Sequence, residues 1–239
     1  MMMPDWEGGW TMKIGIPRAF LYYRYKELWE TFFDELGIEY VVSPETASDL
    51  VRAGSEAAID EACLSSKIYL GHIQWLRERC DAVFVPRISG YTAGTVCTKF
   101  QAVYDVVANT FGGIKLVSYN IEPTVVEGEM AAFIRLGKQL GKKRSKSILA
   151  YVAAKQAQRK MQWNELIRQE RLLRLDGIKI LVVSHRYNLC DKFIGEPVLN
   201  RLRELNALPV PGDVVPKKEA LAKALDISRT LPWAFEKEL

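Results

Sequence analysis

The chain has 239 residues, enough for one large domain or two modest ones with a sizeable buried core. With 49% apolar and 26% charged residues, its composition is that of a globular protein and excludes a disordered chain. The net charge of +4 gives no global electrostatic argument for nucleic acid or membranes, and no apolar run approaches the roughly 20 residues that span a bilayer.

The first twelve residues are predicted to form an N-terminal extension. The stretch "MMMPDWEGGWTM" has neither the basic region nor the apolar run of a signal peptide. We therefore expect a cytoplasmic location, with no membrane partner.

Residues 13–123 alternate short apolar runs with amphipathic segments, which predict strands and helices respectively. The predicted strands are 12–17, 38–43, 81–86 and 114–119, and the predicted helices are 24–37, 44–54, 63–79 and 97–110. Strands that alternate with helices indicate an α/β domain with a parallel sheet, here a four-stranded sheet of the flavodoxin or Rossmann-like type.

The strand signal then stops over a helical connecting segment at 124–175, with predicted helices at 127–141 and 143–175. The stretch "GIKILVVSHRYNLCDKF" at 177–193 restarts the strand–helix pattern, so residues 176–239 are predicted to begin a second, partial α/β domain. One strand with one or two helices cannot cover both faces of a parallel sheet. We expect this part either to pack on the first domain or to be completed from elsewhere.

Two of the four cysteines, Cys63 and Cys97, stand at the starts of predicted helices. Ligands gather at the carboxyl edge of a parallel sheet, where the positive ends of helix dipoles stabilise a thiolate or an anionic iron–sulfur cluster. The chain has no CxxC pair, which disfavours a zinc ribbon or a ferredoxin-type run. A metal site and two ordinary core cysteines both stay open for this pair. Cys80 is expected in the core, and Cys190 in the core or a loop.

Three basic residues are candidates for binding a cofactor or substrate. Arg18 and Arg87 directly follow the first and third predicted strands, where a guanidinium suits a carboxylate or a CoA phosphate. Lys67 lies one helical turn after Cys63 and offers a cation to an anionic cluster, with a solvated helix residue as the alternative. His72, 2.5 turns after Cys63 and on the opposite face, is predicted to be a structural histidine.

The second half repeats this placement of polar residues. His185, Arg186 and Tyr187 follow the restarted strand directly. They are expected at the carboxyl edge of the second sheet, as Arg18 and Arg87 are at that of the first.

The segment from Lys138 to Arg174 is strongly basic, with eleven lysines and arginines against two glutamates. A solvated helix face explains most such segments. The sharper interpretation is a docking surface for an acidic protein partner such as an activating ATPase. No motif supports nucleic acid.

Several runs of the sequence occur in the order of one protein family. They are "IGIPRAF", "FFDELGIEYVVSPET", "DEACLSSKIYLGHIQWL", "DAVFVPRI", "CTKFQAVYDVV", "VVSHRYNLCDKF" and "LPWAFEKE". Over residues 13–239 the chain resembles the 2-hydroxyacyl-CoA dehydratase component family, in particular its branch related to acyl-CoA dehydratase activases. The resemblance implies a flavodoxin- or Rossmann-like two-domain protein that holds an oxygen-sensitive iron–sulfur cluster, of the 4Fe-4S type, between its domains. Two of the family's cysteine ligands match Cys63 and Cys97.

The resemblance also implies a function. The complete enzyme, a lyase of anaerobic metabolism, removes water from a 2-hydroxyacyl-CoA after it receives one electron from an ATP-dependent activase. We expect the chain to take part in this reaction, with the activase and an acyl-CoA as partners. Two alternatives stay open: a non-catalytic regulatory or cluster-holding partner of the activase, and a metal-free α/β domain.

The chain departs from the family in its remaining cysteine ligand. The family takes a further cysteine from deeper in the second domain, and Cys190 stands where relatives more often carry an aromatic residue. We therefore expect an amino-terminal part of a longer protein. A homo- or hetero-oligomer would then complete the second domain, and the isolated chain would bind no cluster or a labile one.

Overall fold

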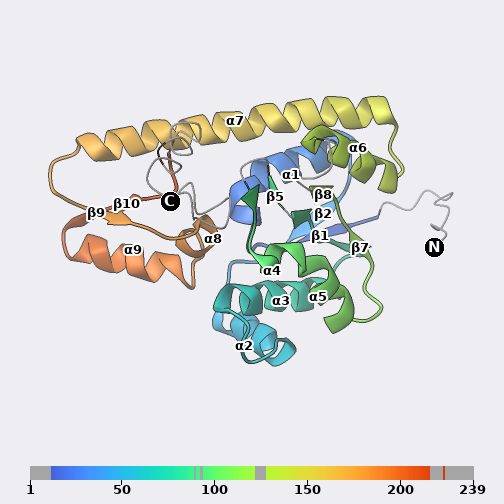
Figure 1. The fold of residues 1–239 in the computed structure, drawn as a ribbon, viewed down its shortest axis with the longest axis horizontal. Helices are drawn as coiled ribbons and strands as arrows, with labels where there is room; N and C mark the ends of the chain where they lie inside the picture. Colours follow the sequence, from blue (N-terminus) through green and yellow to red (C-terminus); the bar gives the residue numbers. More distant parts are fainter. Residues whose placement is uncertain (1–11, 89, 92–93, 122–127, 216–222, 224–239) are drawn as a thin grey trace.

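The computed structural model describes residues 12–88, 90–91, 94–121, 128–215 and 223. The predicted N-terminal extension, apart from Met12, and most of the sequence after residue 215 lie outside the described residues. Figure 1 shows a larger N-terminal half (residues 12–121) and a smaller C-terminal half (residues 178–215), with one long helix running along both.

The N-terminal half is built on a four-stranded parallel sheet, as predicted. Its strands are β1 (Ile14–Ile16), β2 (Tyr40–Val42), β3 (Ala82–Phe84) and β7 (Leu116–Val117), in the order β2-β1-β3-β7. The central strand pairs on both sides, with Gly15 opposite Val41 and Val83. Its isoleucines are fully buried, as expected of a strand inside a parallel sheet.

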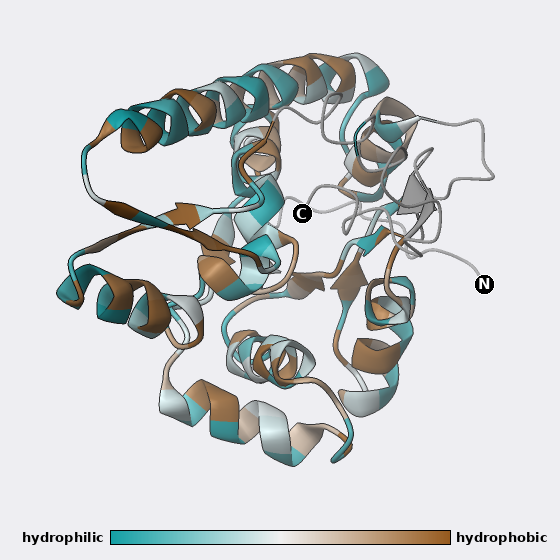
Figure 2. Cartoon of the chain, turned by 60° about the vertical axis from the view of Figure 1, so that its left-hand side comes forward, coloured by the Kyte–Doolittle hydropathy of each residue, from teal (hydrophilic) through white to brown (hydrophobic). Residues whose placement is uncertain are grey.

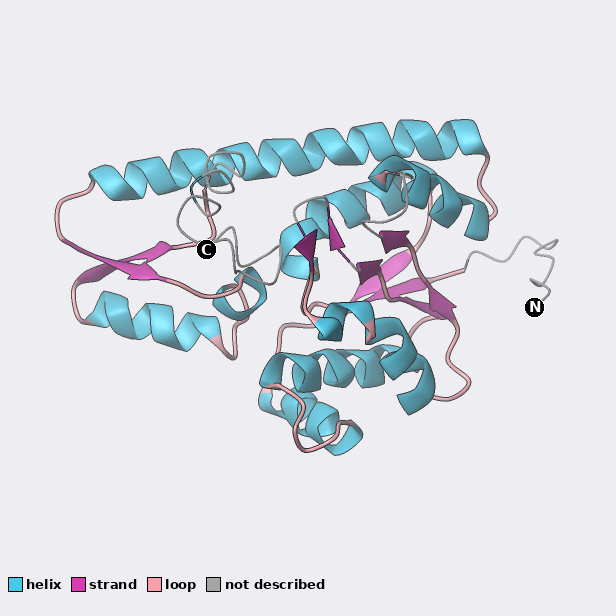
Figure 3. Ribbon diagram, in the orientation of Figure 1, coloured by secondary structure: helices cyan, strands magenta, loops and turns pink. Residues whose placement is uncertain are grey.

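Helices cover both faces of this sheet (Figures 1 and 3). They are α1 (Tyr22–Leu36), α2 (Ser48–Ala57), α3 (Leu64–Leu76), α4 (Thr98–Gln101), α5 (Val103–Thr110), α6 (Glu129–Gln139) and α7 (Arg144–Arg174). Helix α1 lies on one face of the sheet with α6 and α7, while α3 and α5 lie on the other face. No helix among the described residues is long and apolar enough to cross a membrane.

The region after β3 is more divided than the sequence pattern predicted. The single helix expected over 97–110 is split at Ala102, and the expected loop at 87–96 holds short strands. Two small sheets result: β4 (Arg87–Ile88) pairs with β8 (Asn120–Ile121), and β5 (Gly90–Tyr91) pairs with β6 (Gly94–Thr95). Strands of two residues are too short to show an alternating pattern, so they could not be predicted from periodicity.

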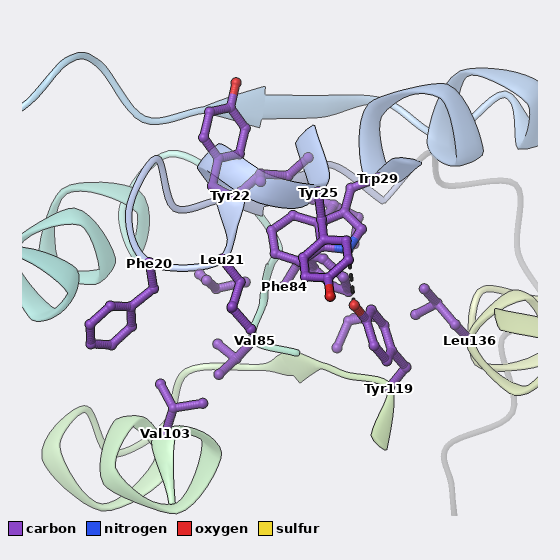
Figure 4. Packing of buried hydrophobic residues seen from close by; sticks show 14 of the residues in the cluster. Phe20, Leu21, Tyr22, Tyr25, Trp29, Phe84, Val85, Val103, Tyr119 and Leu136 are labelled. Carbon is purple, nitrogen blue, oxygen red and sulfur yellow. Dashed lines mark hydrogen bonds between the residues drawn. The ribbon is translucent and has the colours of Figure 1, made fainter. Parts of the chain in front are cut away.

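Aromatic side chains fill the core between α1 and the sheet (Figure 4). Trp29 and Phe84 are buried and meet edge to face, with ring centroids 5.0 Å apart. The indole N–H of Trp29 donates a hydrogen bond of 3.1 Å to the Tyr119 hydroxyl, so the one polar group of the tryptophan is satisfied inside the core. The helix ends at Gly37, whose left-handed backbone (φ 61°) suits glycine.

The C-terminal half is a second β–α–β unit. It consists of β9 (Ile178–Val182), α8 (Arg186–Leu189), α9 (Gly195–Glu204) and β10 (Ala207–Pro211), and its two strands are parallel neighbours. The long helix α7 packs on α1 near its start and reaches β10 further along. The architecture is therefore mixed α/β with parallel strands, as the sequence pattern predicted, and the division into a complete and a partial domain stays a prediction.

Two glycines allow α2 and α3 to pack in direct backbone contact. A Cβ atom added to Gly54 would lie 1.8 Å from the carbonyl oxygen of Lys67, and one added to Gly71 would lie 2.0 Å from that of Leu50. A methyl group at either position would push the helices apart, because neither close atom belongs to a flexible side chain.

Gly54→Ala is therefore expected to lower the free energy of unfolding by roughly 1–3 kcal/mol, despite the better helix propensity of alanine. Urea unfolding monitored by circular dichroism measures this change. Gly112→Ala is the matched control, since its added Cβ meets nothing within 4 Å. Equal stability of the two variants would contradict the close helix contact.

Candidate functional site

Cys63 and Cys97 each occupy the N-cap position of a helix, as their places in the sequence predicted. The Cys63 carbonyl accepts the Ser66 N–H at 2.9 Å at the start of α3, and the Cys97 carbonyl accepts the Phe100 N–H at 2.9 Å at the start of α4. The Cys63 side chain is exposed and lies 3.1 Å from the Ser66 hydroxyl, whereas Cys97 is partly buried against the core.

Both cysteines lie on segments that flank β3. The helix that starts after Cys63 leads back into the amino end of β3, and the segment that carries Cys97 follows its carboxyl end. Because α3 runs antiparallel to the strand and is longer than it, its N-terminus points to the carboxyl edge of the sheet. The chain topology therefore directs both helix N-termini to the edge where ligands of parallel sheets bind.

Neighbouring residues of α8 contact both of these helix starts. The Ser65 hydroxyl, two residues after Cys63, donates a hydrogen bond of 2.8 Å to the Asn188 side-chain oxygen. The Tyr187 ring packs edge-on against Phe100, three residues after Cys97, with ring centroids 5.7 Å apart. A single short helix of the C-terminal half thus ties together the first turns of α3 and α4.

Arg186 fixes α8 in this place. Its Nε–H donates to the Tyr23 carbonyl at 2.9 Å, and its guanidinium pairs with Asp213 at 3.1 Å and with Glu165. These partners lie on α1, after β10 and on α7, and the Arg186 side chain is only 18% exposed. The sequence pattern suggested that Arg186 faces a ligand. In the structure it instead binds α1, α7 and the segment after β10.

A buried polar chain also joins the two halves. Thr46 donates to the Asp191 carboxylate at 2.5 Å, so its oxygen accepts the Nε2–H of His72 at 3.1 Å. The other ring nitrogen of His72 lies 2.8 Å from the Ser43 hydroxyl, and Tyr23 donates to Asp191 at 3.1 Å. His72 is fully buried and fully bonded, which confirms the prediction of a structural histidine.

Asp191 was not singled out from the sequence, although it organises the next turn as well. Its second carboxylate oxygen accepts the N–H groups of Phe193 and Ile194 at 2.8 and 3.1 Å. The side chain is 1% exposed. An aspartate that accepts N–H groups two and three residues later is a common turn signal. Its bond to Thr46, 145 residues away, has no local signature in the sequence.

The three basic candidates do not form one cluster. Lys67 donates to the Asp60 carbonyl at 3.0 Å, within the loop that precedes Cys63. Arg18 pairs with Glu45 after β2 at 3.7 Å. Arg87 lies 3.9 Å from Asp105, and β4, which carries it, pairs with the strand that follows β7. The described contacts therefore give the two arginines different partners.

Arg87 lines a cavity of about 690 Å³ beside β7 and α6. Arg135, Tyr104 and Lys115 line the same cavity, so its wall is rich in cations and aromatic rings. Such a lining suits an organic anion. The prediction that Arg87 binds a carboxylate or phosphate is thus compatible with its position.

The remaining two cysteines follow helix ends, whereas Cys63 and Cys97 precede helix starts. Burial raises the pKa of the Cys80 thiol to about 11, and its sulfur lies 3.1 Å from the Leu76 carbonyl, so it is a core residue as predicted. Cys190 is exposed at the end of α8.

The described residues hold no group of three or more His, Cys, Asp or Glu that could bind a metal ion. Cys63 and Cys97 are both free cysteines at helix starts, and their role as two of a cluster's roughly four ligands stays a prediction. The part of the chain that the structure describes does not supply the full set.

The fold and site define an α/β protein that brings two cysteine-bearing helix starts against one short helix. The model of the family described as the CoA enzyme activase uncharacterised domain matches residues 13–215. The chain therefore belongs to this family, in agreement with the activase-related part of the resemblance. No curated protein matches the chain.

The buried histidine predicts a pH dependence of stability. Desolvation lowers the pKa of His72 from 6.5 to about 4, so the unfolded chain binds a proton more readily than the folded one between these values. Above pH 6.5 the ring is neutral in both states and does not change the free energy of unfolding. As the pH falls from 6.5 to 4, the free energy of unfolding decreases by up to about 3 kcal/mol.

The titration of the His72 ring by NMR tests this directly. The chain has two histidines, so a His185→Asn variant leaves a single imidazole signal that needs no further assignment. The signal is expected to stay in the neutral form down to about pH 4. Protonation near pH 6.5 in the folded protein would contradict the buried hydrogen-bond chain.

Proposed function

We propose that the chain is the cluster-holding part of an activase-dependent 2-hydroxyacyl-CoA dehydratase, with Cys63 and Cys97 as two thiolate ligands of an iron–sulfur cluster of the 4Fe-4S type. The observation that carries this proposal is the contact of α8 with the first turns of both helices, through Asn188 and Tyr187. Membership of an activase-related family supports the link to ATP-driven electron transfer.

The two N-cap positions suit such ligands electrostatically. Each thiolate would sit at the positive end of a helix dipole, which offsets the negative charge of a thiolate-bound cluster. Cys63 is exposed and can therefore meet ligands on another polypeptide, while the partial burial of Cys97 shields one side of the site from water. A bound cluster would supply one-electron transfer to the thioester of an acyl-CoA.

The residues that the structure describes offer two such ligands, and a cluster normally needs about four. The others would come from a second polypeptide or a second copy of the chain. A cluster on the isolated chain should consequently be incomplete and easily lost in air.

The long basic helix gives the proposal a surface for the activase. Arg159, Lys160 and Arg168 on α7 are exposed, whereas Lys155 on the same helix is engaged with Glu129. Exposed cations of this kind would attract an acidic surface on the activase and speed its encounter with the cluster-bearing half.

This docking predicts a strong dependence on salt. Binding of a purified acyl-CoA dehydratase activase, measured by biolayer interferometry, should weaken markedly above physiological ionic strength, because the Debye length of about 8 Å shortens further. Replacement of Lys142, Lys143 and Arg144 by glutamate should weaken it at low salt as well. Binding that ignores both changes would leave the basic segment as a solvated helix face.

A second candidate function is a non-catalytic, cluster-holding regulator of the activase. Arg186 holds α8 in place through three partners that all belong to the chain itself. Such a fixed arrangement suits a protein that only holds a cluster as well as it suits an enzyme. Turnover of a 2-hydroxyacyl-CoA with activase and ATP separates the two candidates. A metal-free domain, the third possibility, is separated from both by iron and sulfide analysis.

Cysteine substitutions test the ligand assignment. After anaerobic reconstitution, Cys63→Ser and Cys97→Ser should each lose most of the iron and acid-labile sulfide that the unaltered chain binds, because each removes one of two thiolates. Cys190→Ser is the matched control, as it removes a free cysteine outside the proposed ligand pair, and it should bind as much iron as the unaltered chain.

Circular dichroism establishes that the variants fold, so that lost iron is not lost structure. Full iron binding by both Cys63→Ser and Cys97→Ser would overturn the ligand assignment. So would an air-stable cluster at full occupancy on the isolated monomer, or loss of iron in Cys190→Ser.

A further inference from the structure

The apolar strand β9 exposes side chains that a parallel sheet normally buries. Ile178, Leu181 and Val183 are 69%, 62% and 58% exposed, whereas Ile14 and Ile16 of β1 are fully buried. The brown colour of the two-stranded sheet in Figure 2 shows the same concentration of apolar residues. Parallel strands are apolar because both of their faces are covered, so β9 has the sequence of an interior strand in an uncovered place.

The two halves of the molecule place β9 and β1 in equivalent positions. Each begins a β–α–β unit and pairs in parallel with the strand that ends the unit: β1 with β2, and β9 with β10. On its other side β1 pairs with β3, but no described residue pairs with the other side of β9.

The hydrogen-bond pattern identifies the backbone groups on this open edge. The Gly212 N–H donates to the Val182 carbonyl at 3.0 Å, so the N–H and C=O of Val182 point toward β10. Along a strand these groups point to alternate sides. The N–H and C=O groups of Lys179, Leu181 and Val183 therefore point away from β10, to the open edge.

The prolines of the sheet show that β10 is its outer strand. Pro209 and Pro211 stand opposite Ile180 and Val182 in the register. By the same alternation their nitrogens face away from β9, so the outer side of β10 lacks two N–H donors and is a poor template for another strand. No proline lies in β9, and none of the described residues pairs with its other edge.

We propose that β9 of a second copy of the chain occupies this edge. The two strands pair antiparallel about a two-fold axis through Leu181 and form a continuous sheet in the order β10-β9-β9-β10. Leu181 then meets Leu181 of the second copy, and Lys179 meets Val183 of the second copy. This register uses all three pairs of free backbone groups on each strand.

In this register the facing side chains of the two β9 strands are compatible with each other. On the face of the sheet opposite Leu181, Ile180 lies against Val182 of the second copy, an apolar β-branched pair of the kind that stabilises sheets. Lys179 is the only charged residue of β9, and its counterpart is an apolar side chain, so no like charges face each other. The interface needs no cluster, and its test is independent of the proposed function.

Sedimentation equilibrium on the cluster-free chain measures the association. We expect a monomer–dimer equilibrium, and we expect Leu181→Asp to weaken it by tenfold or more, because the two carboxylates would lie directly opposite each other. Leu149→Asp is the matched control: Leu149, on α7, is 70% exposed and should tolerate the change without effect on association.

Amide exchange followed by NMR locates the contact. The N–H groups of Lys179, Leu181 and Val183 should exchange fast in dilute samples and slowly in concentrated ones, while protection of the Ile180 and Val182 amides stays unchanged. A chain that stays monomeric at high concentration, or a dimer that Leu149→Asp disrupts and Leu181→Asp does not, would overturn the proposal.

Discussion

The arrangement of the candidate site depends on the docking of α8 against the N-terminal half. Arg186 holds this helix by a hydrogen bond to α1 and by ion pairs with Glu165 and Asp213. Removing the guanidinium would leave two largely buried carboxylates without their cation, a loss of about 3–5 kcal/mol. With the helix fixed, Tyr187 and Asn188 contact the starts of α4 and α3.

This dependence explains why the two halves act as one unit at the site. The Asp191–Thr46–His72 chain is a second connection between them, and every member is buried and bonded. Buried polar groups hold their partners in one geometry because any displacement leaves them unsatisfied. The cysteine-bearing helix starts thus lie against a scaffold that includes residues of both halves.

Much of the fold followed from the sequence, because its strands and helices carry periodic apolar residues that local physics translates directly into structure. The N-cap places of Cys63 and Cys97 could be predicted for the same reason. Arg186 and Asp191 could not be assigned, since the partners that join them to other elements lie 21 to 168 residues away and leave no local pattern. The short strands β4 to β6 were missed because two residues show no alternation.

If the docking of α8 positions both thiols, cluster binding depends on the Arg186 guanidinium. Anaerobic reconstitution of Arg186→Ala tests this most directly, with iron and sulfide measured beside circular dichroism, because both cysteines remain in that variant. Lys192→Ala is the control, since it removes only a surface ion pair with Glu45. Arg186→Ala is expected to stay folded in its N-terminal half but to lose most of its iron, whereas Lys192→Ala should keep its iron. Undiminished iron in a folded Arg186→Ala protein would contradict this dependence.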